Sequence, residues 1–271
     1  MVSVSVIIAT LKSRCEIEAI QVLDHHAFDD YEVIVCDESP VTAARNAGIK
    51  RATTDKLVFL DDDSRPQPGY LERARDVLET EAAYAGRTVH PFDDLFSRHF
   101  TNHYDWGDEP CYVKHFWGCN MGVHRTVFET VGGWDEQMGW GHEEKELAYR
   151  VIEEFDIRYD PDLVVEHPYA DSITDYWRKQ YKLEQKSPYY WSKRDIPLRE
   201  QVLCTLCDAS DPLNYVRRTP MATVTQAGGT IARAAGRIKG LLDGSQRPSR
   251  VPNRPPEIEV ETDPKPELIQ E

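Results

Sequence analysis

The sequence lacks any hydrophobic run that is long enough to cross a membrane. No stretch of the 271 residues approaches the roughly 18 consecutive apolar residues that mark a membrane-spanning helix. The first ten residues, MVSVSVIIAT, are too short for a signal peptide and lack its basic flank. We therefore expect the protein to be made and kept in the cytoplasm, where peripheral attachment to the inner face of the cell membrane stays open.

The sequence also lacks a disulfide framework and an excess of basic residues. Its six cysteines show no informative spacing apart from Cys204 and Cys207, which have no second Cys/His pair nearby and no strand before them. We therefore expect these two thiols to be buried on a helix. The formal net charge of -15 argues against nonspecific nucleic-acid binding, which requires a basic surface.

Strand-like and helix-like segments alternate through the first sixty residues. This alternation is typical of a parallel sheet with right-handed crossover connections. The region after it is less regular, and residues 90–110 form a long aromatic and acidic stretch that we expect to be a functional loop. Strands are predicted at 2–9, 31–36, 57–60, 83–89, 157–159 and 163–166, and helices at 16–25, 41–52, 68–80, 126–131, 142–154 and 171–190.

Three adjacent acids follow the third predicted strand. Residues 57–60 form an apolar run, and Asp61, Asp62 and Asp63 come directly after it. In an open α/β sheet the residues that follow a strand lie at the edge where ligands bind. Adjacent carboxylates repel one another unless a cation lies between them, and oxygen ligands suit Mg²⁺ or Mn²⁺. The motif indicates a cation with a phosphorylated ligand, and a polar turn is the alternative.

A second distinctive stretch is GGWDEQMGWGHEEKELAYR, at residues 132–150. A helix is predicted to begin near His142, so that Glu143 and Glu144 lie in its first turn, where the helix dipole favours acids. Ordinary capping would explain these acids, but the glycine- and tryptophan-rich loop before them favours a functional role. His167 follows another predicted strand, and the acids at the other strand ends make it a candidate metal ligand.

The composition changes after residue 212. Residues 216–242 contain Arg and Lys but no acid, and their apolar residues fall on one side of a helix. Such a helix is typical of a segment that binds the membrane interface or an acidic partner, and packing on the protein's own acidic surface is the alternative. The predicted organisation is a main domain over 1–212, a basic amphipathic helical segment over 213–244 and a disordered, acidic, proline-rich tail over 245–271. The apolar side of the predicted helix consists of Ile231, Ala234, Ala235, Ile238, Leu241 and Leu242.

Together these motifs resemble those of the family 2 glycosyltransferases over roughly residues 2–168. The resemblance implies an α/β fold of the GT-A type, in which a mostly parallel nucleotide-binding sheet is flanked by helices, with a C-terminal helical extension. It also implies an inverting transfer of a sugar from a nucleoside diphosphate sugar to a hydroxyl acceptor, dependent on Mg²⁺ or Mn²⁺. The motifs that carry it are VSVIIAT, CDESP, AARNAGI, FLDDDSRP, GGWDEQMGWGHEEKELAYR and His167.

The resemblance also implies a role for individual residues. This chain departs from the usual pattern at Ala9, where the family commonly has proline, and at Glu144, where it commonly has aspartate. The longer side chain leaves the choice of base between Glu143 and Glu144 open. The implied roles are catalytic base for Glu144, acceptor binding for Glu143 and Trp140, nucleotide binding for Thr10, Asp37, Arg45, Asn46 and Asp61, and metal binding for Asp61, Asp63 and His167.

Two other functions fit parts of the pattern. A metal-dependent phosphatase or nucleotidyltransferase would use Asp61 and Asp63, but it gives no role to the loop before Glu143. A catalytically silent module that binds nucleotide sugars would not need carboxylates after the second strand, after the third strand and at the start of the helix near His142. For the transferase, cytoplasmic placement together with a membrane-contacting segment over residues 216–242 suggests a glycan or a lipid-linked acceptor, as in the assembly of cell-surface glycans.

Overall fold

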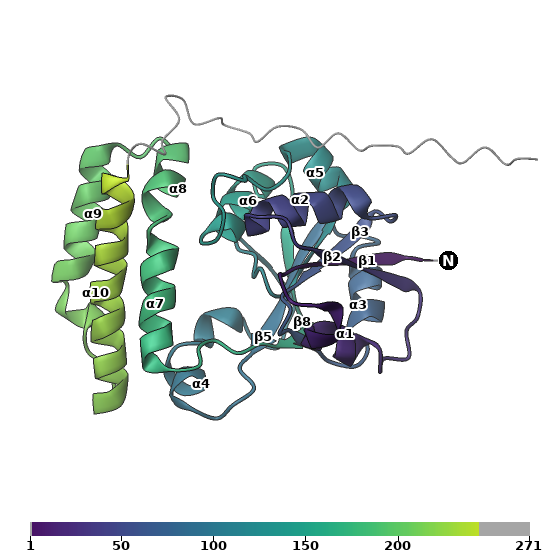
Figure 1. Cartoon of the computed structure of the whole chain (residues 1–271), viewed down its shortest axis with the longest axis horizontal. Helices are drawn as coiled ribbons and strands as arrows, with labels where there is room; N and C mark the ends of the chain where they lie inside the picture. The colour runs from purple at the N-terminus through teal and green to yellow at the C-terminus, as the bar shows by residue number, and fades with distance from the viewer. Residues whose placement is uncertain (1, 244–271) are drawn as a thin grey trace, which may run out of the picture.

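The computed structural model describes residues 2–243. Its centre is an eight-stranded sheet (Figure 1). The strand order is β2-β1-β3-β7-β5-β8-β4, and β6 pairs with β8 outside this path. The strands are β1 (Val4–Ala9), β2 (Tyr31–Cys36), β3 (Lys56–Leu60), β4 (Arg65–Pro66), β5 (Ala83–Val89), β6 (Cys111–Val113), β7 (Met121–His124) and β8 (Ile157–Glu166).

The helices form two groups. Helices α1, α2, α3, α5 and α6 pack on the two faces of the sheet, and α7 to α10 form a separate layer beside it (Figure 1). Helix α4 lies near this layer, where Phe96 packs with Tyr176 of α7 and Ala222 of α10. The helices are η1 (Arg14–Glu16), α1 (Glu18–Leu23), α2 (Val41–Arg51), α3 (Tyr70–Val77), α4 (Leu95–His99), η2 (Asn102–Tyr104), α5 (Arg125–Val131), α6 (Glu143–Val151), α7 (Ile173–Glu184), α8 (Ser187–Lys193), α9 (Leu198–Ser210), η3 (Pro212–Asn214) and α10 (Pro220–Leu242).

The sheet is parallel in its first part and mixed beyond it. Strand β1 pairs in parallel with β2 and β3, as the alternation of strands and helices predicts. Strand β7 lies antiparallel between β3 and β5, and β4 and β6 run antiparallel to β8. Between β5 and β7 the chain passes through α4, η2 and β6, and β7 then runs antiparallel to both of its neighbours in the sheet. Strands β5 and β8 pair in parallel, so the sheet has parallel pairs at β2-β1-β3 and at β5-β8, and the antiparallel β7 joins the two.

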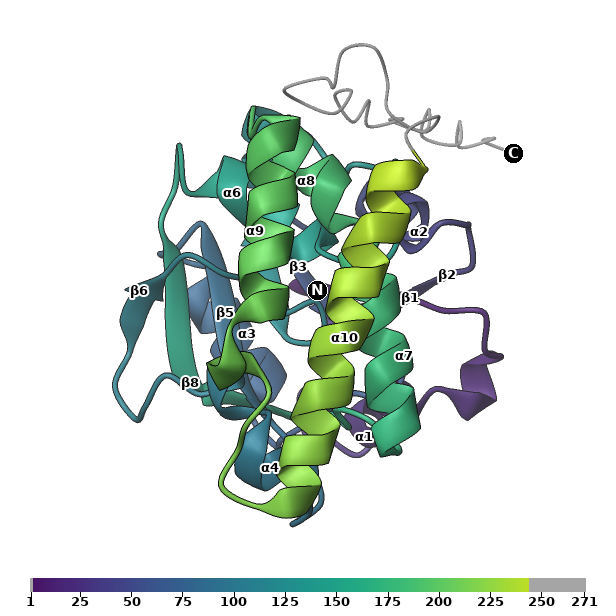
Figure 2. The ribbon, with the colours of Figure 1, turned by 90° about the vertical axis from the view of Figure 1, so that its left-hand side faces the viewer.

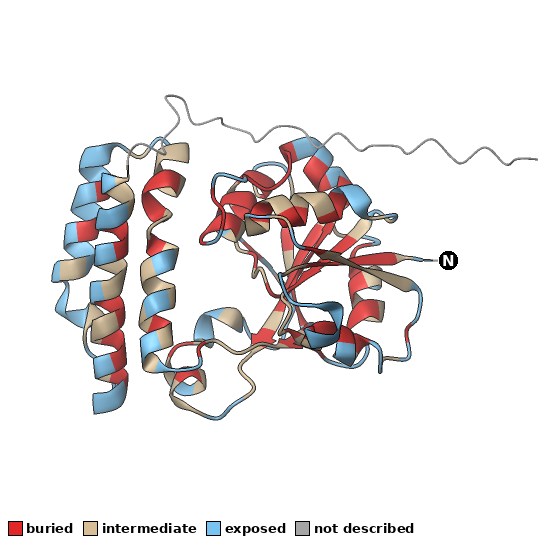
Figure 3. Cartoon of the chain, in the orientation of Figure 1, coloured by how far each residue is buried: buried red, intermediate tan, exposed pale blue. Residues whose placement is uncertain are grey.

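Each face of the sheet carries its own hydrophobic core. One core joins the sheet to α2, α5 and α6, and there the ring of Phe59 makes edge contacts with Phe128 and Trp134 at centroid distances of 5.9 and 5.6 Å. The other core joins the opposite face to α1 and α3. Buried residues are concentrated in the strands and on the helix faces turned toward them (Figure 3). The sheet is therefore fixed from both sides, and its strand ends are held in place.

Several local predictions were wrong. The stretch 90–110 contains α4, a helix of five residues that is too short to give a periodic pattern and that begins where the Asp94 carboxylate accepts the backbone N–H groups of Phe96 and Ser97. The two strands predicted between 157 and 166 are one strand, because a register shift against β5 accommodates the irregular segment. The helix predicted from residue 68 begins at Tyr70, after Gly69 in a left-handed conformation with φ of 84°.

The last four helices pack together as a layer (Figure 2). Helix α10 lies along α7, and small residues on α10 allow the close approach: a Cβ atom on Gly228 would lie 2.2 Å from Cε2 of Trp177. The predicted apolar side of this helix is largely exposed, because the buried face consists of small and polar residues. Cys204 and Cys207 lie on α9 as predicted, but both are exposed, so the expected burial was wrong.

Two predictions concern membranes and the tail. Among the described residues, no helix combines the length and apolar character that crossing a membrane requires. The tail predicted over 245–271 lies outside the described residues.

Candidate functional site

A pocket of about 460 Å³ opens where β3 ends. It lies between the sheet, the first turn of α6 and the inner side of α7, so three separate parts of the chain contribute its walls. The residues that line it are Ala9, Val41, Arg45, Asp61, Asp62, Asp63, His103, Tyr104, Trp117, Gly118, Cys119, Trp140, Gly141, Glu143, Glu144, Lys145, His167, Tyr169, Tyr176, Lys179, Gln180 and Leu183.

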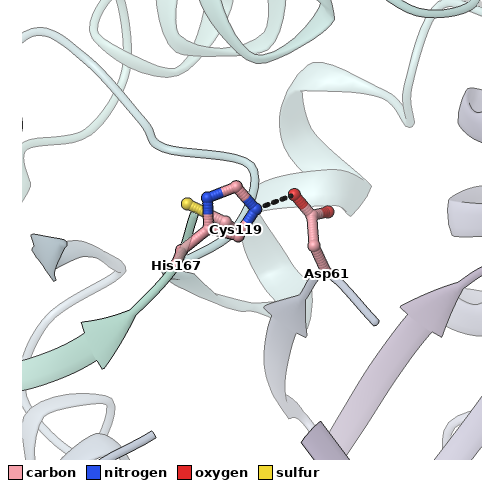
Figure 4. A group of neighbouring side chains, drawn as sticks. All are labelled: Asp61, Cys119 and His167. Atoms are coloured by element: carbon pink, nitrogen blue, oxygen red, sulfur yellow. Dashed lines mark ion pairs between the residues drawn. The ribbon is translucent and has the colours of Figure 1, made fainter. Parts of the chain in front are cut away.

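Two acids from the end of β3 meet a histidine that follows β8. The Nε2 atom of His167 lies 3.1 Å from Oδ1 of Asp63 and 3.5 Å from Oδ2 of Asp61 (Figure 4 shows the second contact). Burial alone would lower the pKa of His167, but the neighbouring Cys119, Asp61 and Asp63 together raise it well above its ordinary value. Two carboxylates and an imidazole at these distances suit a divalent cation, which would take the position of the imidazole proton.

The middle acid of the motif points elsewhere. The Asp62 carboxylate accepts a hydrogen bond from the hydroxyl of Thr10 and pairs with Nζ of Lys12 at 2.7 Å. Asp61, by contrast, faces His167 and Arg45. Burial would raise the pKa of Asp61, but these two groups hold that pKa below its ordinary value. Lys12 was missed from the sequence, although its place in the loop after the first strand, beside an acidic motif, was a usable signal.

A buried arginine connects the acids at the end of β3 to the first turn of α6. Arg45 is only 5% exposed, and its Nη1 donates to Oε1 of Glu143 at 3.0 Å while its Nη2 lies 3.5 Å from Oδ1 of Asp61. Its guanidinium also lies 4.7 Å from the centroid of the Trp134 ring. Arg45 therefore fixes the first turn of α6 relative to the end of β3, in addition to lining the pocket.

The two acids at the start of α6 are in different environments. Glu143 is buried, and its second oxygen accepts the N–H of Gly141 at 2.6 Å, so both of its oxygens are engaged by protein groups. Glu144 lines the pocket and is partly exposed. Burial, and then the negative charge of Glu143, raise the pKa of Glu144 to about 8. Of the two, Glu144 is the one free to act as a base.

The loop before α6 needs unusual backbone conformations to present these acids. Gly141 has φ of 110°, and a Cβ atom there would lie 3.2 Å from the backbone of Leu183 in α7. His142 also has a positive φ, of 61°, and forms the amino-terminal cap position of α6. Trp140, just before them, is 47% exposed beside the pocket. The glycines therefore allow the loop to pass close to α7 on its way into the helix.

Three predicted nucleotide-binding residues lie outside the residues that line the pocket: Thr10, Asp37 and Asn46. Asn46 exchanges hydrogen bonds with the backbone of Trp134, 2.9 Å from its carbonyl oxygen and 2.8 Å from its nitrogen, so it holds the loop before α6. Asp37 is exposed directly after β2. Their roles in nucleotide binding stay predictions.

Aromatic side chains form the remaining wall of the pocket. Tyr104, from the stretch 90–110, packs edge-on against Trp117 at 5.1 Å between ring centroids, and Tyr169 lies beside them. The sequence indicated a functional role for this stretch but did not single out the rings. Helix α7, which lies within the helical region predicted over 171–190, adds Lys179 to the wall.

Comparison with known proteins confirms the resemblance to one family. Residues 18–132 match the model of Glycosyl transferase family 2. The pre-mycofactocin glycosyltransferase of Mycobacterium tuberculosis is 27% identical over an alignment of 254 residues that covers 88% of this chain and 51% of the relative. The glucosyl-dolichyl phosphate glucuronosyltransferase of Haloferax volcanii is 28% identical over an alignment of 131 residues that covers 43% of this chain and 41% of the relative. The chain therefore spans about half the length, or less, of these curated relatives.

A solved structure supports the fold. The mannosyltransferase PcManGT from Pyrobaculum calidifontis, in complex with GDP-Man and Mn²⁺, superposes with a TM-score of 0.51 and covers 92% of this chain and 76% of its own. Its sequence identity to this chain is 15%, so the likeness concerns the fold. The predicted α/β fold of the GT-A type, with a C-terminal helical extension, is confirmed.

Proposed function

We propose that this chain, which resembles the family 2 glycosyltransferases in sequence and in fold, transfers a sugar from a nucleoside diphosphate sugar to a hydroxyl acceptor with inversion. The observation that carries the proposal is the convergence of Asp61, Asp63, His167 and Glu144 on one pocket, although they lie up to 106 positions apart in the chain, from 61 to 167. A cation-binding group and a base that line the same pocket fit a displacement that expels a diphosphate.

The carboxylates of Asp61 and Asp63 and the imidazole of His167 would hold Mg²⁺ or Mn²⁺. When bound, such a cation stabilises the negative charge that grows on the diphosphate as the glycosidic bond breaks. PcManGT, which has the same fold, was solved with Mn²⁺. Lys179, on the α7 side of the same pocket, would add a positive charge near the phosphates. Its Nζ lies 3.3 Å from Oδ2 of Asp175 and donates to the carbonyl oxygen of Tyr169 at 3.0 Å, so this role would require it to exchange these partners for phosphate.

Glu144 would take the proton of the acceptor hydroxyl as the oxygen attacks the anomeric carbon. The new carbon–oxygen bond forms while the bond to the diphosphate breaks, and the diphosphate leaves with the bonding electron pair. Attack from the side opposite the leaving group inverts the anomeric centre. Trp140, exposed at the pocket, offers a flat face on which an acceptor sugar can stack. Glu143, bound to Arg45 and to the loop backbone, would position this turn.

The test of the base is Glu144→Gln, assayed with a panel of UDP- and GDP-sugars in the presence of Mn²⁺. We expect transfer to fall by about two to four orders of magnitude. Nucleotide affinity should stay close to that of the wild type, because the substitution keeps the shape of the side chain. Glu153→Gln, at an exposed position just after the same helix, is the matched control and should leave transfer unchanged.

Two results would contradict this assignment. Equal transfer by Glu144→Gln would place the base elsewhere. Release of inorganic phosphate without glycoside would favour the phosphatase alternative.

The metal role of His167 can be tested without turnover. Mn²⁺ binding to the purified chain can be followed by electron paramagnetic resonance of the free ion. His167→Ala should weaken this binding by on the order of 10-fold or more. An unchanged Mn²⁺ affinity in the variant would remove His167 from the site.

The acceptor proposed here is lipid-linked, at the inner face of a membrane. One relative is named for a dolichyl phosphate substrate. Helices α9 and α10 form the outer layer of the helical group (Figure 2), and both expose large apolar side chains. Leu203 and Leu206 on α9, and Ile231 and Ile238 on α10, are each 51% to 61% exposed. These side chains would enter the interface of an anionic bilayer.

The basic residues of α9, of α10 and of the segment between them are of two kinds: some pair with acids of the protein, and others are exposed to solvent. Arg237 on α10 is buried and pairs with Glu184 and Asp208, so part of the basic segment packs on the protein's own acids, as the alternative interpretation expected. Arg199 and Arg218 are exposed and would attract anionic headgroups. The apolar residues would therefore supply most of the attachment, and the basic ones a smaller, salt-sensitive part.

Vesicle pelleting of the full chain tests the attachment. Wild-type protein should pellet with vesicles that contain phosphatidylglycerol, and Leu203→Ser together with Ile238→Ser should release it. Tyr112→Ser, which removes a similarly exposed ring from β6, is the control and should pellet like the wild type. Equal pelleting of the double variant would refute the surface. A dimer that the double variant abolishes, without vesicle binding by the wild type, would assign the surface to a second copy.

A further inference from the structure

A cysteine thiol lies within the cluster that is proposed to bind the catalytic cation. One carboxylate oxygen of Asp61, one ring nitrogen of His167 and Sγ of Cys119 all lie within 4.8 Å of one another (Figure 4). Cys119 is 5% exposed and lines the pocket. No motif in the sequence assigns this cysteine a role, and the proposed transfer reaction does not use it.

The backbone around Cys119 is firmly held. Its carbonyl oxygen accepts the hydroxyl of Ser64 at 3.1 Å, which connects it to the turn after the acidic motif. The side chain of the next residue, Asn120, donates to the carbonyl oxygens of Arg87 and Leu163, each at 2.9 Å. The thiol itself has only a weak contact, 3.8 Å from the hydroxyl of Thr88. The sulfur is thus kept beside Asp61 and His167 with no strong partner of its own.

The donor set of this cluster differs from that of a site built for a hard cation alone. Mg²⁺ and Mn²⁺ prefer oxygen ligands, which Asp61 and Asp63 provide. Sulfur, imidazole and carboxylate together suit Zn²⁺ and its thiophilic analogue Cd²⁺, which coordinate cysteine sulfur, histidine nitrogen and aspartate oxygen. A softer ion can therefore use one more ligand here than a harder ion can.

We propose that Asp61, Cys119 and His167 form a site for thiophilic divalent cations, with Cys119 as a ligand that Zn²⁺ and Cd²⁺ use and that Mg²⁺ and Mn²⁺ do not. Binding forms a metal–sulfur bond and releases the thiol proton to solvent, with no change of oxidation state. Because Asp61 and His167 are shared, the two kinds of ion exclude each other. This metal binding does not depend on the proposed transferase function. If the chain is a transferase, Zn²⁺ at micromolar concentration should also inhibit the transfer.

The experiment is a Cd²⁺ titration of the full chain, followed by the ultraviolet absorption of the cadmium–thiolate bond. The exposed pair Cys204 and Cys207 on α9 could also bind Cd²⁺, so every variant carries Cys204→Ser and Cys207→Ser. In this background Cys119→Ser should lose the absorption band and weaken Cd²⁺ binding by on the order of 10- to 100-fold. Cys36→Ser, which alters a buried cysteine on β2, is the matched control and should keep both.

Mn²⁺ provides the second measurement and the check on folding. Cys119→Ser should bind Mn²⁺ with nearly the affinity of its parent, and Cd²⁺ should displace Mn²⁺ from the parent at much lower concentration than from the variant. An absorption band that persists in Cys119→Ser would overturn the proposal, as would failure of Cd²⁺ to displace Mn²⁺. An equal loss of Mn²⁺ and Cd²⁺ affinity would also overturn it, because Cys119 would then serve both ions.

Discussion

Replacing Arg45 by methionine tests how the two halves of the pocket are held together. The substitution keeps most of the apolar stem but removes the charge that lies between Glu143 and Asp61. The Glu143 side chain is only 6% exposed, so its carboxylate would be left buried without a counterion. The Asp61 side chain is 39% exposed, and solvent would screen its charge. The loss of unfolding free energy therefore comes mainly from the buried Glu143 carboxylate.

The size of the effect follows from this burial. Removing one partner of a buried ion pair costs about 3–5 kcal/mol of unfolding free energy. A chain of this size loses about 2–4 °C of melting temperature per kcal/mol, so Arg45→Met should melt roughly 6–20 °C lower. The measurement is thermal unfolding by circular dichroism with a chelator present, because a cation bound at Asp61 would offset part of the loss.

Two comparison variants make this prediction specific. Glu143→Gln in the Arg45→Met background removes the unpaired charge and should restore a large part of the lost stability. Arg51→Met, on the same helix, breaks an exposed pair with Glu38 and should cost less than about 1 kcal/mol. If Arg45→Met melted within about 2 °C of the wild type, the arginine would not be holding α6 to the end of β3.

Four further predictions concern Glu144, the packing of α10 on α7, and the residue that precedes β7. The transfer rate should rise with pH between the ordinary glutamate range and about 8, as Glu144 loses its proton, and a flat profile would exclude it as the base. Over the same interval folding stability should fall as pH rises, because the folded chain retains a proton that the unfolded chain has lost, and Glu144→Gln should remove this decline. Gly228→Ala should lower stability by about 1–3 kcal/mol in thermal unfolding, because its Cβ would collide with Trp177, and an unchanged midpoint would mean that α10 does not pack on α7 as described. Asn120→Asp should destabilise the chain by about 1–3 kcal/mol, because a carboxylate would face two backbone carbonyls in place of an amide donor, and denaturant unfolding would measure this.

Features set by local pattern were predictable from the sequence. The strands Tyr31–Cys36 and Ala83–Val89 have the predicted bounds, since β-branched and aromatic residues favour the extended backbone. The contact of His167 with Asp63 could also be expected, because strand ends of one sheet meet at its edge. Such rules depend on the order of elements and on residue type, and a sequence displays both.

Features set by packing between distant segments were not predictable in the same way. The position of Cys119 depends on the antiparallel return of β7 beside β3, and no local pattern gives the direction of that return. Exposure of Cys204 and Cys207 depends on which side of α9 the layer leaves uncovered. The bond from Arg45 to Glu143 joins residues 98 positions apart, so it depends on the rotation of two helices about their axes.

The most direct test of the account is a crystal structure of the chain with Mn²⁺ and a nucleoside diphosphate, with the metal located by its anomalous scattering. The account predicts one anomalous peak within coordination distance of Asp61, Asp63 and His167, with the diphosphate in contact with it and Glu144 facing the same pocket. A peak at other residues, or a nucleotide bound away from this pocket, would contradict it.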